Sequence, residues 1–547
     1  MLSALQYFVP IIVGLVLHWT YFIHGEKDLL AATIARKHIL AGAIIMYLKC
    51  QYEGLPARQA IYELINLSSI YASTIFTSIS IYRLLLSPLC GIPGPLGMRI
   101  SKLTHVWTLM DSTRQNFNEL HRLRSKYGSV VRTGPNEVTL FGYDAYHKVH
   151  GSESNCGRSA YYDILHPMVS LDTTRDPAIH MSRRKLWDQA FSIKALKENE
   201  KPVYNYAMLL MEKLRQRMAE KLDLSTWFEY YTFDLMGSLG LTIDFNNLTT
   251  EGHPILNLWH IAHKKLGPLN SAPWIKHLLM GIPFIERIKY YRQFMRWAHD
   301  ELDNNIKLHT QNNKCDRKNI IGLVLSDAIK HGGVEKNWNF VLGDFVLVVA
   351  AGSDPVRLVL SNAVYYLLRN PEHLAKVRQE LSSIDVFDYN SLQSLQHLTA
   401  CIYETLRLHP AVPSAGLRMA PEQGITINGV FIPGGTTLVT PQYSLHRDED
   451  CFLEPNEWIP ERFTTKPELI LNKNAFVPWS IGKMACLGKN LSMMEIRVAL
   501  ALLLTHFNIH LAPGEDGTEL FSHATDFFTT TPGAFNVFLE SHIPLTE

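Results

Sequence analysis

A cysteine near the carboxyl-terminal end lies in a setting that suits a metal-bound thiolate. Cys486 follows a loop that contains Gly482, and a helix is expected to begin near Gly488. Free N–H groups and the positive end of a helix dipole lower the pKa of a thiol at such a position. A sulfur that stays ionised can bind a haem iron and donate electron density that favours O–O cleavage. Taken alone, a cysteine before a helix is more often an ordinary small buried side chain, so other residues must decide.

Two further segments precede this cysteine. Glu404 and Arg407 are three residues apart, a spacing that places both side chains on one face of a helix, where a charge pair can form. Residues 452–463, FLEPNEWIPERF, form a proline-rich segment that contributes Arg462. The first segment could also be an ordinary solvated helix and the second a surface loop. Their order along the chain before Cys486 favours a shared functional role.

In these segments the chain resembles the cytochrome P-450 family, of fungal microsomal type. The haem-loop pattern of that family, FxxGxRxCxG, is matched here by Gly482, Cys486 and Gly488, with Trp479 for the aromatic residue and Met484 for the arginine. The resemblance implies that Cys486 binds the iron of haem b (heme b, iron protoporphyrin IX). It further implies that Trp479 covers the thiolate and that another group takes the contact of the missing arginine.

The other motifs of the family follow in its order. Glu404 and Arg407 match the ExxR helix, and the segment that contains Arg462 matches FxPxxWxPERF almost completely. The resemblance, which covers roughly residues 90 to 545, implies that Glu404, Arg407 and Arg462 form a network that braces the haem loop.

The resemblance also implies groups that hold the haem propionates. His180 and Arg184 lie one helical turn apart in a segment similar to the C-helix of the family, and Arg418 matches another propionate-binding position. Guanidinium groups suit this role because they bind carboxylates in a bidentate manner. Lys483 is a candidate replacement for the arginine absent at Met484. The alternative for each cation is an ordinary surface charge.

Residues 346–360 resemble the distal helix of the family, which faces the oxygen site. Gly352, Ser353 and Asp354 match its motif, but Pro355 stands where the family has threonine. Proline has no N–H and its ring opposes the carbonyl one turn earlier, so the helix should still open there. Because the hydroxyl is lost, the hypothesis is that ordered water, assisted by Asp354 or Ser353, relays protons. A kinked core helix is the structural alternative.

The elements expected to position these residues give a mainly α fold with small β-sheets (α+β). Helical patterns cover residues 113–126, 183–197, 202–222, 338–368, 371–381, 395–408 and 489–507. Strand patterns cover residues 129–141 and 425–440, the second with a hairpin turn at Asn428–Gly429. The resemblance implies the cytochrome P-450 fold.

Three apolar segments precede this body. Residues 5–23 are almost uncharged and long enough to cross a bilayer, and the absence of a basic stretch before them argues against a cleaved signal peptide. Residues 39–48 and 65–82 are weaker candidates, so one to three crossings remain open. We assign residues 1–86 to a membrane anchor, residues 87–97, with three prolines, to a hinge, and residues 98–547 to a haem-thiolate catalytic domain. The expected location is the endoplasmic reticulum membrane, with the catalytic domain facing the cytosol.

Composition excludes several classes of protein. Fifty-two basic and 51 acidic residues give a net charge of +1, which argues against a nucleic-acid binder. The seven cysteines form no CxxC pair, so a disulfide framework or zinc module is not expected. The chain has no nicotinamide or flavin fingerprint, so electrons must come from a partner. The family implies NADPH–cytochrome P-450 reductase, with cytochrome b5 as a second candidate, docking on a cationic surface around the cysteine. That surface is expected to carry Arg183, Lys185, Lys194, Lys483 and Lys489.

The leading functional hypothesis is a monooxygenase that hydroxylates or epoxidises a lipophilic small molecule with O₂ and NADPH-derived electrons. The resemblance to fungal members points to secondary metabolism of terpenoids, indole alkaloids or polyketides. Substrate contacts are expected in residues 161–172, 348–353, 413–417 and 527–530, which are largely apolar or aromatic. Two alternatives stay open: a haem-thiolate enzyme that catalyses desaturation, ring formation or rearrangement without net oxygen insertion, and a non-catalytic membrane haem-binding protein.

Overall fold

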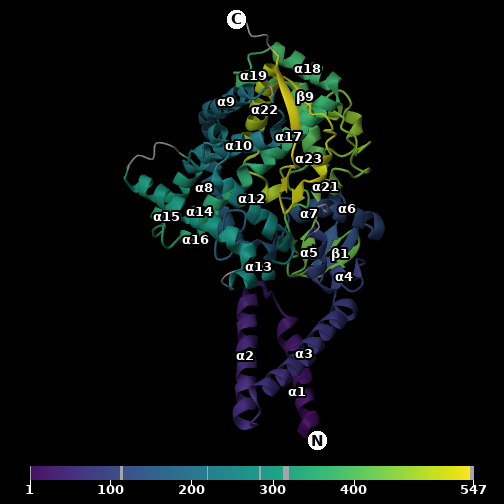
Figure 1. Cartoon of the computed structure of the whole chain (residues 1–547). Helices are drawn as coiled ribbons and strands as arrows, with labels where there is room; N and C mark the ends of the chain where they lie inside the picture. The colour runs from purple at the N-terminus through teal and green to yellow at the C-terminus, as the bar shows by residue number, and fades with distance from the viewer. Residues whose placement is uncertain (1, 111–114, 219, 283–284, 312–318, 543–547) are drawn as a thin grey trace.

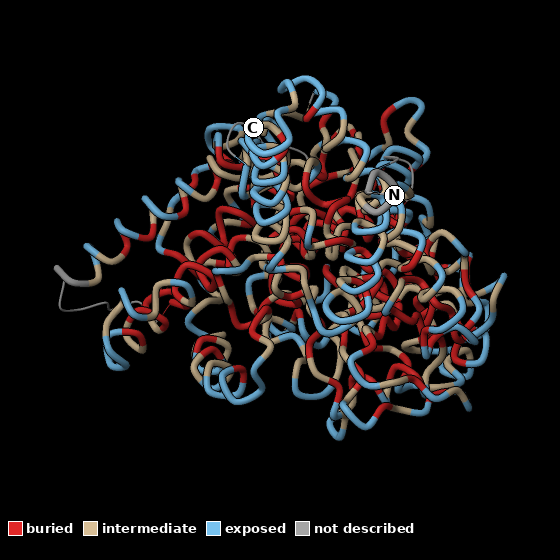
Figure 2. Tube along the Cα trace, turned by 90° about the horizontal axis from the view of Figure 1, so that it is seen from below, coloured by how far each residue is buried: buried red, intermediate tan, exposed pale blue. Residues whose placement is uncertain are grey.

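A large helical body stands on a separate group of three helices in the computed structural model (Figure 1). The structure describes residues 2–110, 115–218, 220–282, 285–311 and 319–542. Most of the body is helical and its sheets are small, as the sequence predicts. Seen from below, buried residues concentrate in the body, whereas the helices near the N-terminus show mainly exposed and intermediate residues (Figure 2).

The three N-terminal helices run alternately towards and away from the body. They are α1 (Leu2–Leu17), extended by a π-helical turn to Phe22, α2 (Ala31–Tyr52) and α3 (Ala57–Ile81), extended to Leu86. The helical stretches 28–52 and 57–86 are long and apolar enough to cross a membrane, whereas 6–22 is shorter. Residues 39–48 and 65–82, the weaker candidates for membrane crossing in the sequence, therefore lie in the two longer helices. A third helical stretch of sufficient length, 338–369, lies largely buried inside the body.

Polar contacts join these three helices. The ring of His18 in α1 lies 2.7 Å from the hydroxyl of Ser78 in α3, and the ring of His38 in α2 lies 2.8 Å from that of Tyr71. At the end far from the body, Lys49 pairs with Glu63 and Glu53. In an apolar surrounding a polar group without a partner is costly, so these pairs favour a packed group of helices over three independent ones.

The junction between the helices and the body is also packed. Glu26, in the turn after α1, forms two bonds of 2.7 and 2.8 Å with Arg175 of the body. Arg132 is fully buried and donates to the carbonyl oxygen of Arg83 at 2.7 Å. Leu89 and Ile92 of the expected hinge are buried in the body core. Part of the proline-rich segment therefore packs into the body.

Seven helices of the body contribute the buried residues closest to the candidate site in the sequence and the fold. Residues from α9 (Ile193–Gln216), α10 (Leu224–Met236), α17 (Asp354–Arg369), α20 (Gln396–Leu408) and α22 (Lys489–His506) share the largest buried cluster. A second cluster contains residues of α16 (Trp338–Gly352) together with Trp187 of α8 (Pro177–Ala190). The second cluster also contains residues of α12 (Pro254–Leu266), α14 (Glu286–Gln311) and α15 (Ile320–Lys330), and the first also contains residues of α18 (Pro371–Ser382). Further helices of the body are α6 (Asn116–Tyr127) and α13 (Pro273–Met280).

The main sheet has five short strands in the order β1-β2-β8-β5-β3. Their bounds are Val130–Gly134, Glu137–Leu140, Thr437–Val439, Arg418–Met419 and Gly157–Arg158. Smaller sheets pair β6 (Ile425–Ile427) with β7 (Val430–Ile432), β10 (Thr525–Asp526) with β11 (Thr530–Thr531), and β12 (Asn536–Ser541) with β4 (Leu222–Asp223) and β9 (Phe507–Leu511). In the β3–β5 pair, Arg158 lies directly opposite Arg418.

Two predicted helices are divided in the structure. The segment 183–197 is interrupted between α8 and α9, because Ser192 caps a new helix by accepting the N–H of Ala195 at 3.3 Å. Pro202 therefore lies inside α9 instead of beginning a helix. The segment 338–368 is divided at Ser353, between α16 and α17. The start of the predicted helix at residue 113 lies outside the described residues.

Candidate functional site

The loop around Cys486 is a tight turn held by its own backbone. Ser480 and Gly482 have positive φ angles of 58° and 71°, and the N–H of Cys486 donates to the carbonyl oxygen of Trp479 at 2.8 Å. A Cβ at position 482 would lie 2.3 Å from the carbonyl oxygen of His150, so the close approach of the two chains requires glycine. At Gly488 a Cβ would touch the sulfur of Cys486 at 3.8 Å without a clash, so protein packing does not explain that glycine. It leaves space beside the sulfur.

The thiol of Cys486 experiences opposing effects. Its side chain is exposed, yet burial by neighbouring protein atoms raises the pKa of the thiol above its ordinary value. The N–H groups of Gly488 and Lys489 and the positive charge of Arg184 lower this pKa. The expected effect of the helix N-terminus is therefore present, but desolvation outweighs it. A cation on the sulfur would shift this balance towards the thiolate.

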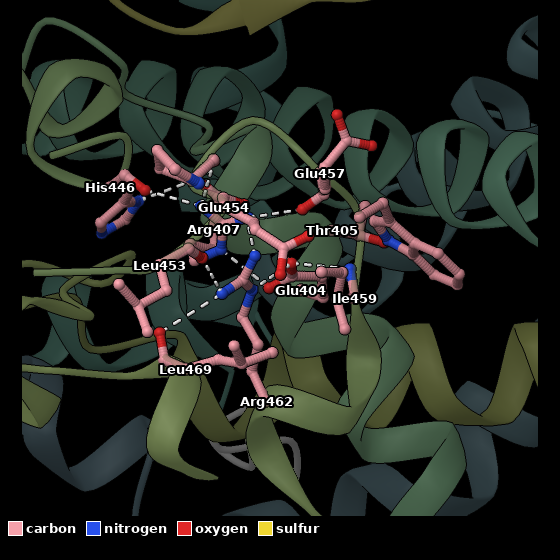
Figure 3. A network of polar contacts seen from close by, with 12 residues as sticks. Glu404, Thr405, Arg407, His446, Leu453, Glu454, Glu457, Ile459, Arg462 and Leu469 are labelled. Carbon is pink, nitrogen blue, oxygen red and sulfur yellow. Dashed lines mark hydrogen bonds and ion pairs between the residues drawn. The ribbon is translucent and has the colours of Figure 1, made fainter. Parts of the chain in front are cut away.

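Glu404, Arg407 and Arg462 form the predicted network, and all three side chains are fully buried (Figure 3). Arg407 binds Glu404 through two bonds of 2.8 Å, and Nε of Arg462 donates to the same carboxylate at 2.9 Å. The remaining N–H groups of the two arginines bind backbone carbonyl oxygens of the segment that leads to the cysteine loop, those of His446, Leu453, Glu454, Pro455, Glu457 and Leu469. The predicted contacts are confirmed. The network fixes backbone over a long stretch because buried guanidinium groups need every donor satisfied.

His446 connects this network to the cysteine loop. One ring nitrogen lies 3.0 Å from the carbonyl oxygen of Arg407, and the other accepts the N–H of Val477 at 3.0 Å. Burial and the charge of Arg407 lower the pKa of His446 to about 3, so the ring is neutral and can donate on one side and accept on the other. Sequence reasoning missed this residue, since a single histidine in a loop gives no local signal.

Four cationic or basic side chains gather beside the main sheet. Arg158 and Arg418 are 6% exposed and face each other across the β3–β5 pair, and His180 of α8 is buried nearby. Burial and the charges of Arg158, Arg184 and Arg418 lower the pKa of His180 to about 4. Within the described part of the chain, no carboxylate lies within ion-pair distance of Arg158 or Arg418. Like charges directly opposite on a sheet are unfavourable without an anion between them.

This arrangement fits a dianionic group such as the two propionates of haem. Arg184 also donates to the carbonyl oxygen of Ala485 at 2.7 Å, which places this cation beside the cysteine loop. Met484, at the position of the missing arginine, contacts the guanidinium of Arg418. Lys483 is exposed at the surface. The buried Arg158 is therefore a better candidate than Lys483 to replace the missing arginine. Sequence reasoning missed Arg158 because its neighbour Arg418 is 260 positions away and only strand pairing brings the two together.

The distal helix opens at the predicted place. The helix α16 ends at Gly352, and α17 begins at Asp354 with Pro355 in its first turn. Proline lacks the N–H that would reach the carbonyl of Ala351, so the backbone turns at Ser353. Ala351 is exposed although its helix is otherwise largely buried, and Leu487, next to Cys486, packs against the same buried cluster as α16. The opened helix and the cysteine loop thus border one region of the body.

Ser353 and Asp354 are both buried at this opening. The hydroxyl of Ser353 and Oδ1 of Asp354 have no hydrogen-bond partner among the residues that the structure describes. The other carboxylate oxygen accepts from the hydroxyl of Thr531 at 3.3 Å. Burial and the charge of Glu229 raise the pKa of Asp354, whereas Arg357, His260 and Thr531 lower it. A buried carboxyl whose pKa is raised holds a proton more readily than an exposed one, so it can exchange protons with water bound beside it.

Aromatic side chains from two expected substrate segments meet. Tyr161 stacks on Phe528 with ring centroids 5.7 Å apart, and Tyr162 meets the same ring edge-on at 6.2 Å. Phe528 has a φ of 113°, a strained conformation for a residue with a side chain and one that is concentrated at functional sites. Val348 and Val349 are buried in the core. The aromatic group is thus the better candidate for substrate contact than the buried valines.

Four of the five cations expected on the surface near the cysteine are exposed, and the fifth is a correction. Lys185, Lys194, Lys483 and Lys489 are exposed. Arg183 is not available, because its side chain is 12% exposed, pairs with the buried Asp344 of α16 and covers the ring of Phe340 at 4.5 Å. The packing of α16 against α8 turns this charge inwards.

Comparisons with known proteins agree with this geometry. A family model described as Cytochrome P450 matches residues 98–536. The cytochrome P450 monooxygenase notG' of Aspergillus versicolor is 32% identical over 535 residues, which cover 96% of each chain. The tryprostatin B 6-hydroxylase of Aspergillus fumigatus is 32% identical over 532 residues, 94% of this chain and 93% of the relative. The solved haem domain of cytochrome P450DA has a TM-score of 0.68 at 18% identity and covers 83% of this chain and 98% of that one. This last likeness concerns the fold.

Proposed function

Since the chain belongs to the cytochrome P450 family and is a haem-containing monooxygenase, we propose that it hydroxylates or epoxidises a lipophilic secondary metabolite. The balanced reaction for hydroxylation is RH + O₂ + NADPH + H⁺ → ROH + H₂O + NADP⁺. Relatives described as monooxygenases, one of them named a hydroxylase, support oxygen insertion over rearrangement and over a non-catalytic role. The aromatic group of Tyr161, Tyr162 and Phe528 supports a lipophilic substrate.

Cys486 is the residue that would bind the haem iron through its sulfur. Arg158, Arg184 and Arg418, with His180, are proposed to bind the propionates, and Trp479 is proposed to cover the sulfur. When bound, the haem supplies the centre at which dioxygen is activated. The protein contributes a loop of fixed geometry, because His446 and the buried network of Glu404, Arg407 and Arg462 hold the backbone that carries the cysteine.

Asp354 is the proposed proton carrier of the oxygen side. Its Oδ1 and the hydroxyl of Ser353 have no hydrogen-bond partner in the described part of the chain, so they can hold water at the opening made by Pro355 and Gly352, where the family has a threonine hydroxyl. The raised pKa of Asp354 allows the carboxyl to take a proton from such water and return it to the site.

The three N-terminal helices are the proposed anchor in the endoplasmic reticulum membrane. A first helix that runs towards the body requires the N-terminus on the opposite side of the membrane from the catalytic domain (Figure 1). Lys27, Arg36 and Lys37 then lie near the cytosolic face, in accord with the preference for positive residues on that side. A tag at the N-terminus should be protected from protease in sealed microsomes, and digestion of the tag would contradict three crossings.

The proposed electron donor is NADPH–cytochrome P450 reductase, with cytochrome b5 as a second donor. The exposed lysines Lys185, Lys194, Lys483 and Lys489 near the cysteine loop support docking of an acidic partner. Because such steering is electrostatic, electron transfer should slow with rising ionic strength.

The observation that carries the proposal is the exposed Cys486 on a loop fixed by the buried network. The parent protein should give the thiolate type of reduced carbon monoxide difference spectrum, and Cys486→Ser should lose it together with turnover. Label from ¹⁸O₂ in the product of NADPH- and reductase-dependent turnover tests oxygen insertion. An unlabelled product would instead support desaturation or rearrangement.

A further inference from the structure

A polar cavity of about 410 Å³ adjoins the buried end of α17. It is bordered by side chains of α10, α12, α17 and the β10–β11 hairpin, which include Glu229, His260, Arg357 and Thr531. The rim carries exposed polar residues, among them Glu251, Lys264 and His523. A polar space of this size holds several water molecules.

Charged groups continue from this cavity towards Asp354. Oε1 of Glu229 lies 2.5 Å from Nε2 of His260 and 2.9 Å from Nη1 of Arg357. Glu229 is buried, whereas 36% of the His260 side chain is exposed, so the pair spans from solvent to the interior. Thr531 borders the cavity and donates to Oδ2 of Asp354 at 3.3 Å.

The inner end of this series has unfilled bonding capacity. Oδ1 of Asp354 and Oγ of Ser353 are buried, and neither has a hydrogen-bond partner in the described ranges. Buried polar atoms are normally bonded to protein or to ordered water. A water chain from the cavity would satisfy both atoms.

We propose that this cavity is the entrance through which protons reach Asp354, with the Glu229–His260 pair as its acid–base group at the solvent side. This inference rests on the proposed role of Asp354 and adds the route by which protons reach it and the acid–base pair at the solvent end of that route. Two protons must reach the oxygen site in each turnover, one for each hydrogen of the water released; oxidation of NADPH at the reductase returns one proton to solvent, so the net consumption is one. Each passes from water to the Glu229–His260 pair, through cavity water to Oδ1 of Asp354, and is replaced at His260 from solvent.

The charges around Asp354 support such a route. Glu229 of α10 raises the pKa of the carboxyl, and Arg357 of α17 and His260 of α12 lower it. The charges of the Glu229–His260 pair therefore affect the pKa of Asp354. Pro355 stands where the family has a threonine hydroxyl. A proton route that ends at the carboxyl of Asp354 and the hydroxyl of Ser353 does not require that threonine.

The test compares E229Q and H260Q with E251Q, which changes a carboxylate on the rim of the same cavity that has an exposed partner, Arg217. We expect E229Q and H260Q to lower the fraction of NADPH electrons recovered in product severalfold, to raise hydrogen peroxide release and to increase the solvent deuterium isotope effect. E251Q should match the parent. The haem content and the reduced carbon monoxide spectrum should stay unchanged in all three variants.

A second measurement is independent of turnover. The infrared band of the protonated Asp354 carboxyl, identified by its loss in D354N, should disappear at lower pH in E229Q and at higher pH in H260Q than in the parent. If D354N is uncoupled but E229Q and H260Q behave like E251Q in both measurements, the route is wrong and the role of Asp354 stands. If D354N itself is fully coupled, the role of Asp354 and the route both fail, whereas monooxygenation is judged separately by ¹⁸O₂ incorporation. H260Q changes a half-exposed side chain, so it keeps the test valid if E229Q does not fold.

Discussion

Arg158 offers a sharp test of how the protein holds its haem. The structure places this buried arginine directly opposite Arg418 with no carboxylate at ion-pair distance in the part of the chain that it describes. If both arginines bind propionates, Arg158→Gln removes a charge-assisted, bidentate contact that contributes about 1.5–3 kcal/mol. Haem should then bind roughly ten- to a hundredfold more weakly.

The same substitution should affect the protein without haem very differently. It removes a like-charge pair that costs roughly 0.2–1 kcal/mol in a sheet. It also removes the 2.5 Å bond from Arg158 to the carbonyl oxygen of Thr174, which contributes about 1 kcal/mol. Relief of the like-charge pair offsets part of this loss and of the lost attraction between Arg158 and the buried Asp172, so the melting temperature of the apoprotein should fall by a few degrees at most.

The assay is the transfer of haem to a high-affinity acceptor protein, followed in the Soret band, with thermal melting of the apoprotein measured in parallel. Arg158→Lys retains the charge and should recover part of the affinity. Arg378→Gln is a matched control, because Arg378 also binds one backbone carbonyl, that of Phe507, but lies on α18. Haem affinity of Arg158→Gln within twofold of the parent, or an apoprotein destabilised as much as the holoprotein, would refute the reasoning.

Three further outcomes follow from the packing. Arg462→Leu leaves the carboxylate of Glu404 with one partner fewer in a fully buried site and should cost about 3–5 kcal/mol, which denaturant unfolding would show; a loss under 1 kcal/mol would contradict a structural role for the network. His446 has a pKa of about 3 in the folded protein against an ordinary value of 6.5, so the unfolded chain binds the extra proton and stability falls by about 1.4 kcal/mol per pH unit from this residue as the pH decreases from 6.5 towards 3. His446→Gln should therefore be less stable at neutral pH but show a shallower acid dependence, and an unchanged slope would count against the assignment. A truncated chain that begins before Arg83 should fold more stably than one that begins at residue 90, because the carbonyl of Arg83 accepts from the buried Arg132; equal melting temperatures would show that this bond is dispensable.

The site motifs were readable from the sequence because their geometry is local. The spacing of Glu404 and Arg407 places them on one helical face, and the glycines and cysteine of the haem loop lie within a few residues of each other. The replacement of threonine by Pro355 also acts locally, and the structure opens the helix where the sequence predicts.

Boundaries and surface assignments were less secure because they depend on competition between neighbours. The cap at Ser192 divides a pattern that looks continuous, since a few hydrogen bonds decide between one helix and two. Arg183 has the sequence context of an exposed cation, but the buried carboxylate of Asp344 draws it inwards. A residue's own type does not reveal which charge packs against it.

The sequence by itself determined the motifs of the candidate site: a cysteine in a glycine-containing loop, the spacing of Glu404 and Arg407, a distal helix segment with Pro355 in place of threonine, and apolar N-terminal segments. Only the tertiary structure decided that Arg158 faces Arg418, that His446 ties Arg407 to the cysteine loop, and that Glu229 and His260 lead from solvent towards Asp354. Each of these contacts joins segments far apart along the chain. Strand register and helix packing bring such segments together, and these are set by the free energy of the whole core and not by any local pattern.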